Sequence, residues 1–204
     1  MTTPEDNYAR IVADNLARLC DNRPADLAQR LCARREGDRF LFSAFGRACV
    51  VSPDAVRLDG RIESGVLGIL ISLYARFAQA DPCVLEPLKG FKQLPDSMPY
   101  AGAFVARTQQ VLVPHVERIQ RHRDRIAAQF ACGDVPTGVS GDFALLLYPL
   151  PKIALCYVFY LADEDFPASV TCLYSANAAR HMPTDALADI GEYTSQALLR
   201  IVGR

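Results

Sequence analysis

A predicted helix in the second half of the chain carries the side chains best suited to chemistry. At about 100° per residue, one stripe of this helix holds His115, Ile119, His122, Ile126 and Phe130. The two histidines are seven positions apart, about 10 Å along a helix, so they cannot bind one metal ion together as a pair four positions apart does. Each could line a pocket as an axial ligand or a proton donor. Each could equally lie at the edge of the core, bonded to a backbone carbonyl group.

The neighbouring stripe of the same helix is basic and holds Arg118, Arg121 and Arg125. Guanidinium groups at this spacing could bind a carboxylate or a phosphate. The same pattern is also typical of a solvated helix face. No aromatic residues are interleaved to stack on bases, so the pattern does not favour nucleic acid.

Two further groups of residues resemble metal ligands but lack the required patterns. Asp163, Glu164 and Asp165 could supply oxygen ligands to a hard cation, yet the calcium-loop pattern with its glycine is missing, and a charged hairpin loop is expected instead. The seven cysteines form no Cys-x-x-Cys pair. Cys49, Cys156 and Cys172 lie inside apolar runs and are expected to be reduced core thiols. No metal site is predicted, although a thiol ligand set drawn from distant positions stays open.

Local signatures of common enzymes are absent from the sequence. The glycines of segment 133–141 precede no Gly-Lys-Ser/Thr, and neither a Gly-x-Ser-x-Gly elbow nor a His-Glu-x-x-His helix occurs. A site assembled from distant residues leaves no such mark, so an enzyme is not excluded and no cofactor can be named.

Composition limits the class of protein. The chain has 204 residues, half of them apolar, so it can bury a sizeable core. Its net charge of −1 gives no overall electrostatic attraction to nucleic acid or anionic lipid. The first residues include acidic side chains instead of a basic region followed by an apolar one. This pattern argues against a signal peptide and favours a cytoplasmic location.

The apolar stretch 143–162 is long enough to span a bilayer. However, Pro149, Pro151 and Lys152 lie near its middle, and a lysine there is costly in a membrane. The runs on either side are aromatic, branched or leucine. We therefore expect two consecutive strands, buried on both faces or nearly so, rather than a membrane span.

Hydrophobic periodicity predicts the remaining elements. Helices are expected at residues 4–20, 24–31, 66–80, 100–113 and 184–202, and from Pro114, which starts or kinks a long helix, to Cys132. A hairpin with strands 40–42 and 49–51 turns at Phe45-Gly46, and 56–58 adds a short strand. Strands at both ends of a helical middle predict an α+β fold, with an antiparallel or mixed sheet packed against several helices in a single domain, residues 1–204.

Three segments resemble a known family. They are FKQLPD at residues 91–96 with Tyr100 and Phe104 after it, FPASVTCLY at 166–174, and MPTDAL at 182–187. Together they resemble the domain of unknown function 3786 family, found mainly in anaerobic bacteria and archaea. The resemblance extends from Tyr8 to Leu198 and implies no catalytic residue. Some relatives occur beside or fused to iron–sulfur and corrinoid proteins, which implies a small molecule or a partner protein of anaerobic cofactor metabolism. Ser175 stands where an acid usually follows the aromatic residue.

Three functions are compatible with these patterns. The first is an accessory protein that binds a small anionic ligand or cofactor between the Pro-rich loop 88–100 and the histidine face. Its candidate ligand-binding residues are His115, His122, Arg118, Arg121, Phe91, Tyr100 and His181. The second is an enzyme with His181, His122 or Glu164 as proton-transfer group. The third is an interaction module that buries the Pro-rich loop against a partner protein.

Overall fold

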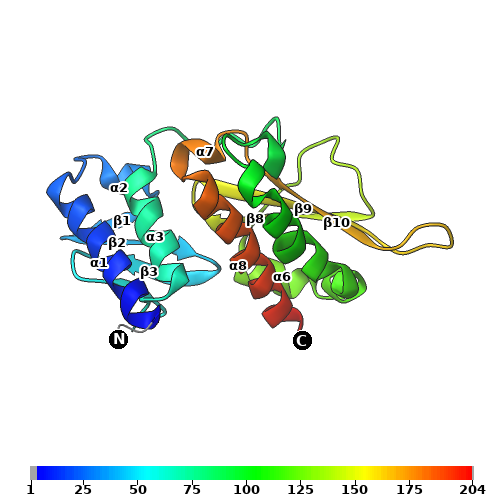
Figure 1. Cartoon of the computed structure of the whole chain (residues 1–204), viewed down its shortest axis with the longest axis horizontal. Helices are drawn as coiled ribbons and strands as arrows, with labels where there is room; N and C mark the ends of the chain where they lie inside the picture. The colour runs from blue at the N-terminus through cyan, green and yellow to red at the C-terminus, as the bar shows by residue number, and fades with distance from the viewer. Residues whose placement is uncertain (1–3, 204) are drawn as a thin grey trace.

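The computed structural model describes residues 4–203, which form two lobes that lie side by side (Figure 1). The first lobe, residues 4–80, contains α1 (Pro4–Asp21), α2 (Leu27–Arg30), β1 (Arg34–Glu36), β2 (Arg39–Ala44), β3 (Arg47–Val51), β4 (Val56–Leu58), β5 (Arg61–Ile62) and α3 (Val66–Phe77). Its strands form an antiparallel sheet in the order β1-β2-β3-β4-β5. The predicted hairpin is confirmed, because Phe45 and Gly46 turn the chain between β2 and β3 with φ angles of 52° and 71°.

The second lobe, residues 81–203, contains a longer sheet and most of the helices. It begins with β6 (Lys89–Gly90), the 3-10 turns Phe91–Gln93 and Met98–Tyr100, α4 (Ala101–Phe104), a π-helical segment η3 (Val105–Gln109) and a 3-10 segment η4 (Gln110–His115). It continues with α5 (Val116–Arg121), α6 (Arg123–Gln129), β7 (Ala131–Gly133), β8 (Phe143–Leu150), β9 (Ile153–Tyr160), β10 (Ser169–Tyr174), α7 (Ala178–His181) and α8 (Thr184–Val202). The strand order is β6-β10-β9-β8-β7, again antiparallel. The α+β prediction is confirmed, with two antiparallel sheets in place of one.

The apolar stretch forms strands β8 and β9, as predicted. A two-residue turn at Pro151 and Lys152 joins them, and Leu150 pairs with Ile153. Every side chain of β9 except Tyr160 is buried. Within residues 4–203, no helix has the length and apolar character needed to cross a membrane.

Helix α8 is bonded to the inner face of the second sheet through buried tyrosines. The hydroxyl group of Tyr157 donates to the Gly191 carbonyl oxygen at 3.2 Å, and that of Tyr174 donates to the Leu187 carbonyl oxygen at 2.7 Å. Burial raises the pKa of both hydroxyl groups, so they stay protonated donors. Gly191 permits this approach, since a Cβ there would lie 2.9 Å from the Tyr174 hydroxyl.

The predicted long helix from Pro114 to Cys132 is wrong. The chain runs through η4, α5 and α6, with a break at His122 (φ −108°, ψ 18°), and Cys132 lies in β7. At the break, the His122 backbone N–H is shared between the carbonyl oxygens of Arg118 and Ile119. The imidazole of His122 also bonds to the Arg118 carbonyl oxygen at 2.8 Å, which ends the regular helical pattern. Segment 100–113 is helical as predicted, but as successive short α, π and 3-10 pieces.

The turn between β2 and β3 joins the two lobes. The backbone N–H of Phe45 donates to the Pro149 carbonyl oxygen at 2.7 Å. Gly46 lies against the end of α6, where an added Cβ would meet the Gln129 carbonyl oxygen at 2.8 Å. Glycine is therefore required at this position both for its positive φ and for the close approach of the second lobe.

We expect Gly46→Ala to lower the free energy of unfolding by about 3 kcal/mol or more. The cost of placing alanine in left-handed backbone adds to the cost of the clash of its Cβ with the second lobe. Gly60→Ala is the matched control, because Gly60 also has a positive φ (78°) but open space around it. Its cost should be about 1–2 kcal/mol, from the backbone alone. Urea unfolding of both variants measures the difference, and equal costs would show that the lobe contact at Gly46 is not tight.

Candidate functional site

The structure brings together three of the seven candidate ligand-binding residues. His115, Arg118 and Arg121 line one pocket of about 400 Å³. Its other wall is the base of the arm, the long connection 161–168 that joins β9 to β10 and projects from the lobe (Figure 1). We call this site the arm-base pocket.

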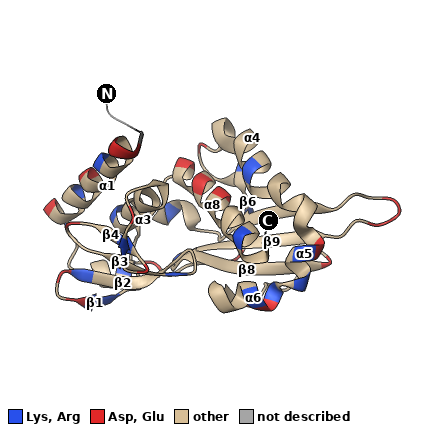
Figure 2. Ribbon diagram, turned by 90° about the horizontal axis from the view of Figure 1, so that it is seen from below, with Lys and Arg blue, Asp and Glu red and all other residues tan. Residues whose placement is uncertain are grey.

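The arm-base pocket is positively charged because neither guanidinium group forms an ion pair within residues 4–203. Arg118 donates from Nη1 to the Gly203 carbonyl oxygen, and Arg121 donates from Nε to the Glu117 carbonyl oxygen at 3.4 Å. Glu117 is the one acid in the lining. The remaining N–H groups of both arginines can therefore bind an anion. Figure 2 marks basic residues along α5 and α6 and acidic residues at the tip of the arm.

The aromatic candidates lie elsewhere. Phe91 is 4% exposed and stacks on Phe104 with ring centres 4.3 Å apart, so it belongs to the core. Tyr100 lies beside a different hollow, whose lining includes Asp185, Asp189 and Glu192. Phe91 and Tyr100 thus lie outside the pocket that His115, Arg118 and Arg121 line.

His122 is a half-buried residue at the break between α5 and α6. Its Nδ1 lies 2.8 Å from the Arg118 carbonyl oxygen, which can only accept, so Nδ1 carries the proton. This arrangement matches the interpretation of a core-edge histidine bonded to a backbone carbonyl group. His122 is not part of the arm-base pocket.

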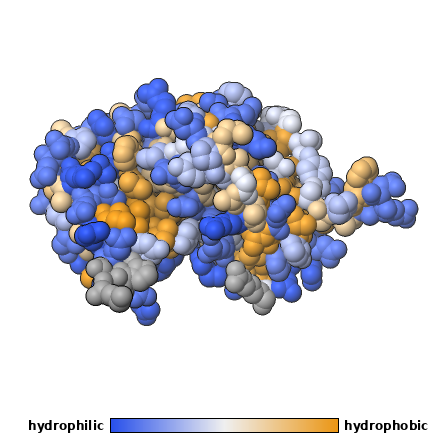
Figure 3. Space-filling model, viewed as in Figure 1, coloured by the Kyte–Doolittle hydropathy of each residue, from blue (hydrophilic) through white to orange (hydrophobic). Residues whose placement is uncertain are grey.

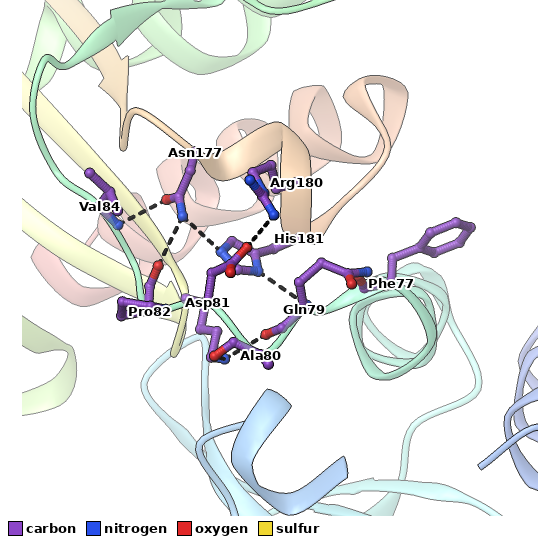
Figure 4. A network of polar contacts seen from close by, with 10 residues as sticks. Phe77, Gln79, Ala80, Asp81, Pro82, Val84, Asn177, Arg180 and His181 are labelled. Carbon is purple, nitrogen blue, oxygen red and sulfur yellow. Dashed lines mark hydrogen bonds and ion pairs between the residues drawn. The ribbon is translucent and has the colours of Figure 1, made fainter. Parts of the chain in front are cut away.

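His181, the last candidate, is fully buried in a polar network between the lobes (Figure 4). The Gln79 backbone N–H lies 3.3 Å from its Nδ1, and Nε2 lies 3.2 Å from Asn177 Nδ2. Asn177 also accepts from the Val84 backbone N–H and donates to the Pro82 carbonyl oxygen, both at 2.9 Å. The network therefore holds the segment that leaves α3 against α7.

Lys152 is the second buried member of this network, and sequence reasoning missed its role. It is 2% exposed, and its Nζ donates to the carbonyl oxygens of Gln79 at 2.6 Å and Ala80 at 3.2 Å. The available signal was a lone lysine inside an apolar stretch, which indicated a strand but not a partner. The ammonium group connects the β8–β9 turn to the chain that links the lobes.

The network is suited to structure rather than to chemistry. Its lysine and histidine are closed off from solvent, and both imidazole nitrogens have neighbours. The three residues proposed for proton transfer do not lie at one site. Glu164 is exposed on the arm, His181 is buried between the lobes, and His122 lies between α5 and α6. Residues 4–203 contain no group of three or more histidine, cysteine or acidic side chains placed to hold a metal ion.

The cysteines and the acidic loop lie as predicted. Cys49, Cys156 and Cys172 are buried and unbridged. Asp163 accepts the backbone N–H groups of Asp165 at 2.9 Å and Phe166 at 2.7 Å, so the acids form part of the arm's turn.

We expect Lys152→Met to lower the free energy of unfolding by about 2–4 kcal/mol, because two buried carbonyl oxygens would lose their donor. Lys92→Met is the matched control, since Lys92 is exposed, and it should change stability by less than about 0.5 kcal/mol. Denaturant unfolding compares the two variants. Equal small effects would mean that the Lys152 ammonium group contributes nothing net to folding.

The network also predicts a pH dependence. Burial, with the charge of Lys152 and a smaller effect of Arg180, lowers the pKa of His181, although Asp81 and the Pro82 carbonyl oppose this. Because the folded-state pKa lies below the unfolded value of about 6.5, the unfolded chain takes up the proton first, and stability falls as pH falls below about 6.5. His181→Gln should flatten this slope in unfolding measured between pH 7.5 and pH 5. His115→Gln controls for removal of an imidazole; an unchanged slope in the His181 variant would contradict the assignment.

Comparison with curated proteins and with solved structures gives no match. A family model described as Domain of unknown function (DUF3786) matches residues 23–197, a range that takes in most of both lobes. The resemblance of the chain to this family is therefore confirmed over residues 23–197. The description carries no activity, so the chemistry of the site rests on its geometry alone. Since the model matches most of the chain, the protein belongs to the DUF3786 family.

Proposed function

We propose that this protein binds a small anionic ligand in the arm-base pocket without converting it. The observation that carries the proposal is the convergence of His115, Arg118 and Arg121 on one pocket of about 400 Å³. This volume suits a small molecule. Guanidinium groups donate in a planar fork that matches carboxylate and phosphate groups.

The electrostatics of the pocket support an anion. Arg121 uses a long 3.4 Å bond to a backbone oxygen, which leaves its Nη groups for a ligand. Arg118 is anchored to the Gly203 carbonyl oxygen, so the end of α8 holds one guanidinium group in position. By contrast, the groove of about 410 Å³ on the outer face of the second sheet has one charged lining residue, Glu86, and does not favour an anion.

The alternative functions have less support. A proton-transfer enzyme would need His181, His122 or Glu164 near a substrate, and these three residues lie apart, with His181 closed off from solvent. An interaction module would use the Pro-rich loop, where Phe91 and Leu94 are already buried in the protein's own core, although Met98 is 70% exposed. We further propose a cytoplasmic role in anaerobic cofactor metabolism, which rests on the family resemblance.

Binding of inorganic phosphate and citrate by isothermal titration calorimetry at constant ionic strength tests the proposal. Arg121→Gln should weaken binding about tenfold, because it removes a charge-assisted hydrogen bond. His115→Gln should weaken binding less, since the amide keeps a donor. Arg61→Gln is the control, because Arg61 is exposed and lies in none of the pockets described above. Equal affinity of wild type and Arg121→Gln for both anions would refute the arm-base site.

A further inference from the structure

A second basic cleft lies between the two lobes, away from the arm. Its volume is about 400 Å³. The first lobe contributes Phe45 of the β2–β3 turn, Arg47 at the start of β3 and Leu67 of α3. The second lobe contributes α6 and the last turns of α8. The surface is hollowed between the two halves on the face shown in Figure 3. We call this site the interlobe cleft.

Three arginines from three elements line the interlobe cleft: Arg47 of β3, Arg125 of α6 and Arg200 of α8. Arg47 is held by Asp59, with Nε to Oδ2 at 2.7 Å. Arg125 and Arg200 have neither an ion pair nor a side-chain hydrogen bond within the part of the chain that the structure describes. No Asp or Glu lines the cleft. The two unpaired guanidinium groups of Arg125 and Arg200 converge on a lining without Asp or Glu, which favours an anion from solution.

The rest of the lining is apolar or aromatic. Phe45 is 3% exposed and forms part of the wall, and the half-buried side chains of Leu67 and Tyr193 continue it. The Gln129 amide adds one neutral polar group. A bare inorganic ion would leave this apolar surface uncovered, whereas a compact organic anion would cover it.

We propose that the interlobe cleft binds a small organic anion, with a carboxylate or phosphate group on Arg125 and Arg200 and an apolar or flat body against Phe45 and Tyr193. The ligand contacts both lobes, so its binding stabilises their packing. The site goes beyond the proposed function, because none of its lining residues belongs to the arm-base pocket. Its arginines lie at positions 47, 125 and 200, a spacing that leaves no local motif.

Calorimetry with phenyl phosphate and inorganic phosphate at constant ionic strength tests the cleft. Wild type should bind phenyl phosphate more tightly than inorganic phosphate, and the double variant Arg125→Gln/Arg200→Gln should lose about tenfold or more in affinity for phenyl phosphate. Phenyl phosphate should also raise the melting temperature of wild type more than that of the double variant. Both arginines are exposed and unpaired, so the variant should fold as wild type does, which its melting temperature without ligand checks.

Two matched variants separate this proposal from the arm-base site. Arg121→Gln should keep the tighter phenyl phosphate site and lose only weaker binding at the arm base, whereas Arg61→Gln, which lies in neither pocket, should change neither. Loss of phenyl phosphate binding in Arg121→Gln with retention in the double variant would place the anion at the arm base and overturn the interlobe cleft. Absence of phenyl phosphate binding to wild type would overturn it as well. If the double variant alone loses binding, the cleft stands even where the arm-base proposal fails.

Discussion

Burial of both faces of strands β8 and β9 is the constraint on which the surrounding structure depends. A strand with apolar side chains on both faces needs other parts of the protein packed against each face. On the inner face, α8 is fixed by hydrogen bonds from Tyr157 and Tyr174 to its carbonyl oxygens. On the outer face, Leu146, Cys156 and Val158 are covered by loop residues such as Leu85 and Val139 rather than by a helix. Segments 81–88 and 134–141, which contain no helix or strand, are therefore required by the core.

The same strands determine how the two lobes join. Near the end of β8, the Pro149 carbonyl oxygen accepts from the backbone N–H of Phe45 in the first lobe. In the turn that follows, Lys152 donates to the carbonyl oxygens after α3. A lysine is long enough to reach those oxygens while its stem stays in the apolar interior. The lobes share one continuous hydrophobic cluster, which supports the prediction of a single domain. The costly buried charge thus lies where one turn connects both halves of the chain.

The sequence allowed the main elements to be predicted, because long periodic or continuous apolar runs leave few alternatives. It did not allow the short strands β1, β5, β6 and β7 to be predicted, since their two or three residues, unlike Val56–Leu58 of β4, do not place a polar residue between two apolar ones. The partner of Lys152 was likewise hidden, because Gln79 and Ala80 contribute backbone oxygens that any residue would supply. Phe91 was assigned to a pocket because it belongs to the Pro-rich loop, whereas stacking on Phe104 buries it in the core.

The break at His122 accounts for the distribution of basic residues over two sites. On one continuous helix, Arg118, Arg121 and Arg125 would form a single stripe and face a single surface. The break changes the direction of α6 relative to α5. Arg118 and Arg121 therefore line the arm-base pocket, whereas Arg125 lines the interlobe cleft with Arg200. The imidazole of His122 contributes to this separation through its bond to the Arg118 carbonyl oxygen. A residue predicted to contact a ligand thus acts on the helix geometry, and it is this geometry that separates the two basic sites.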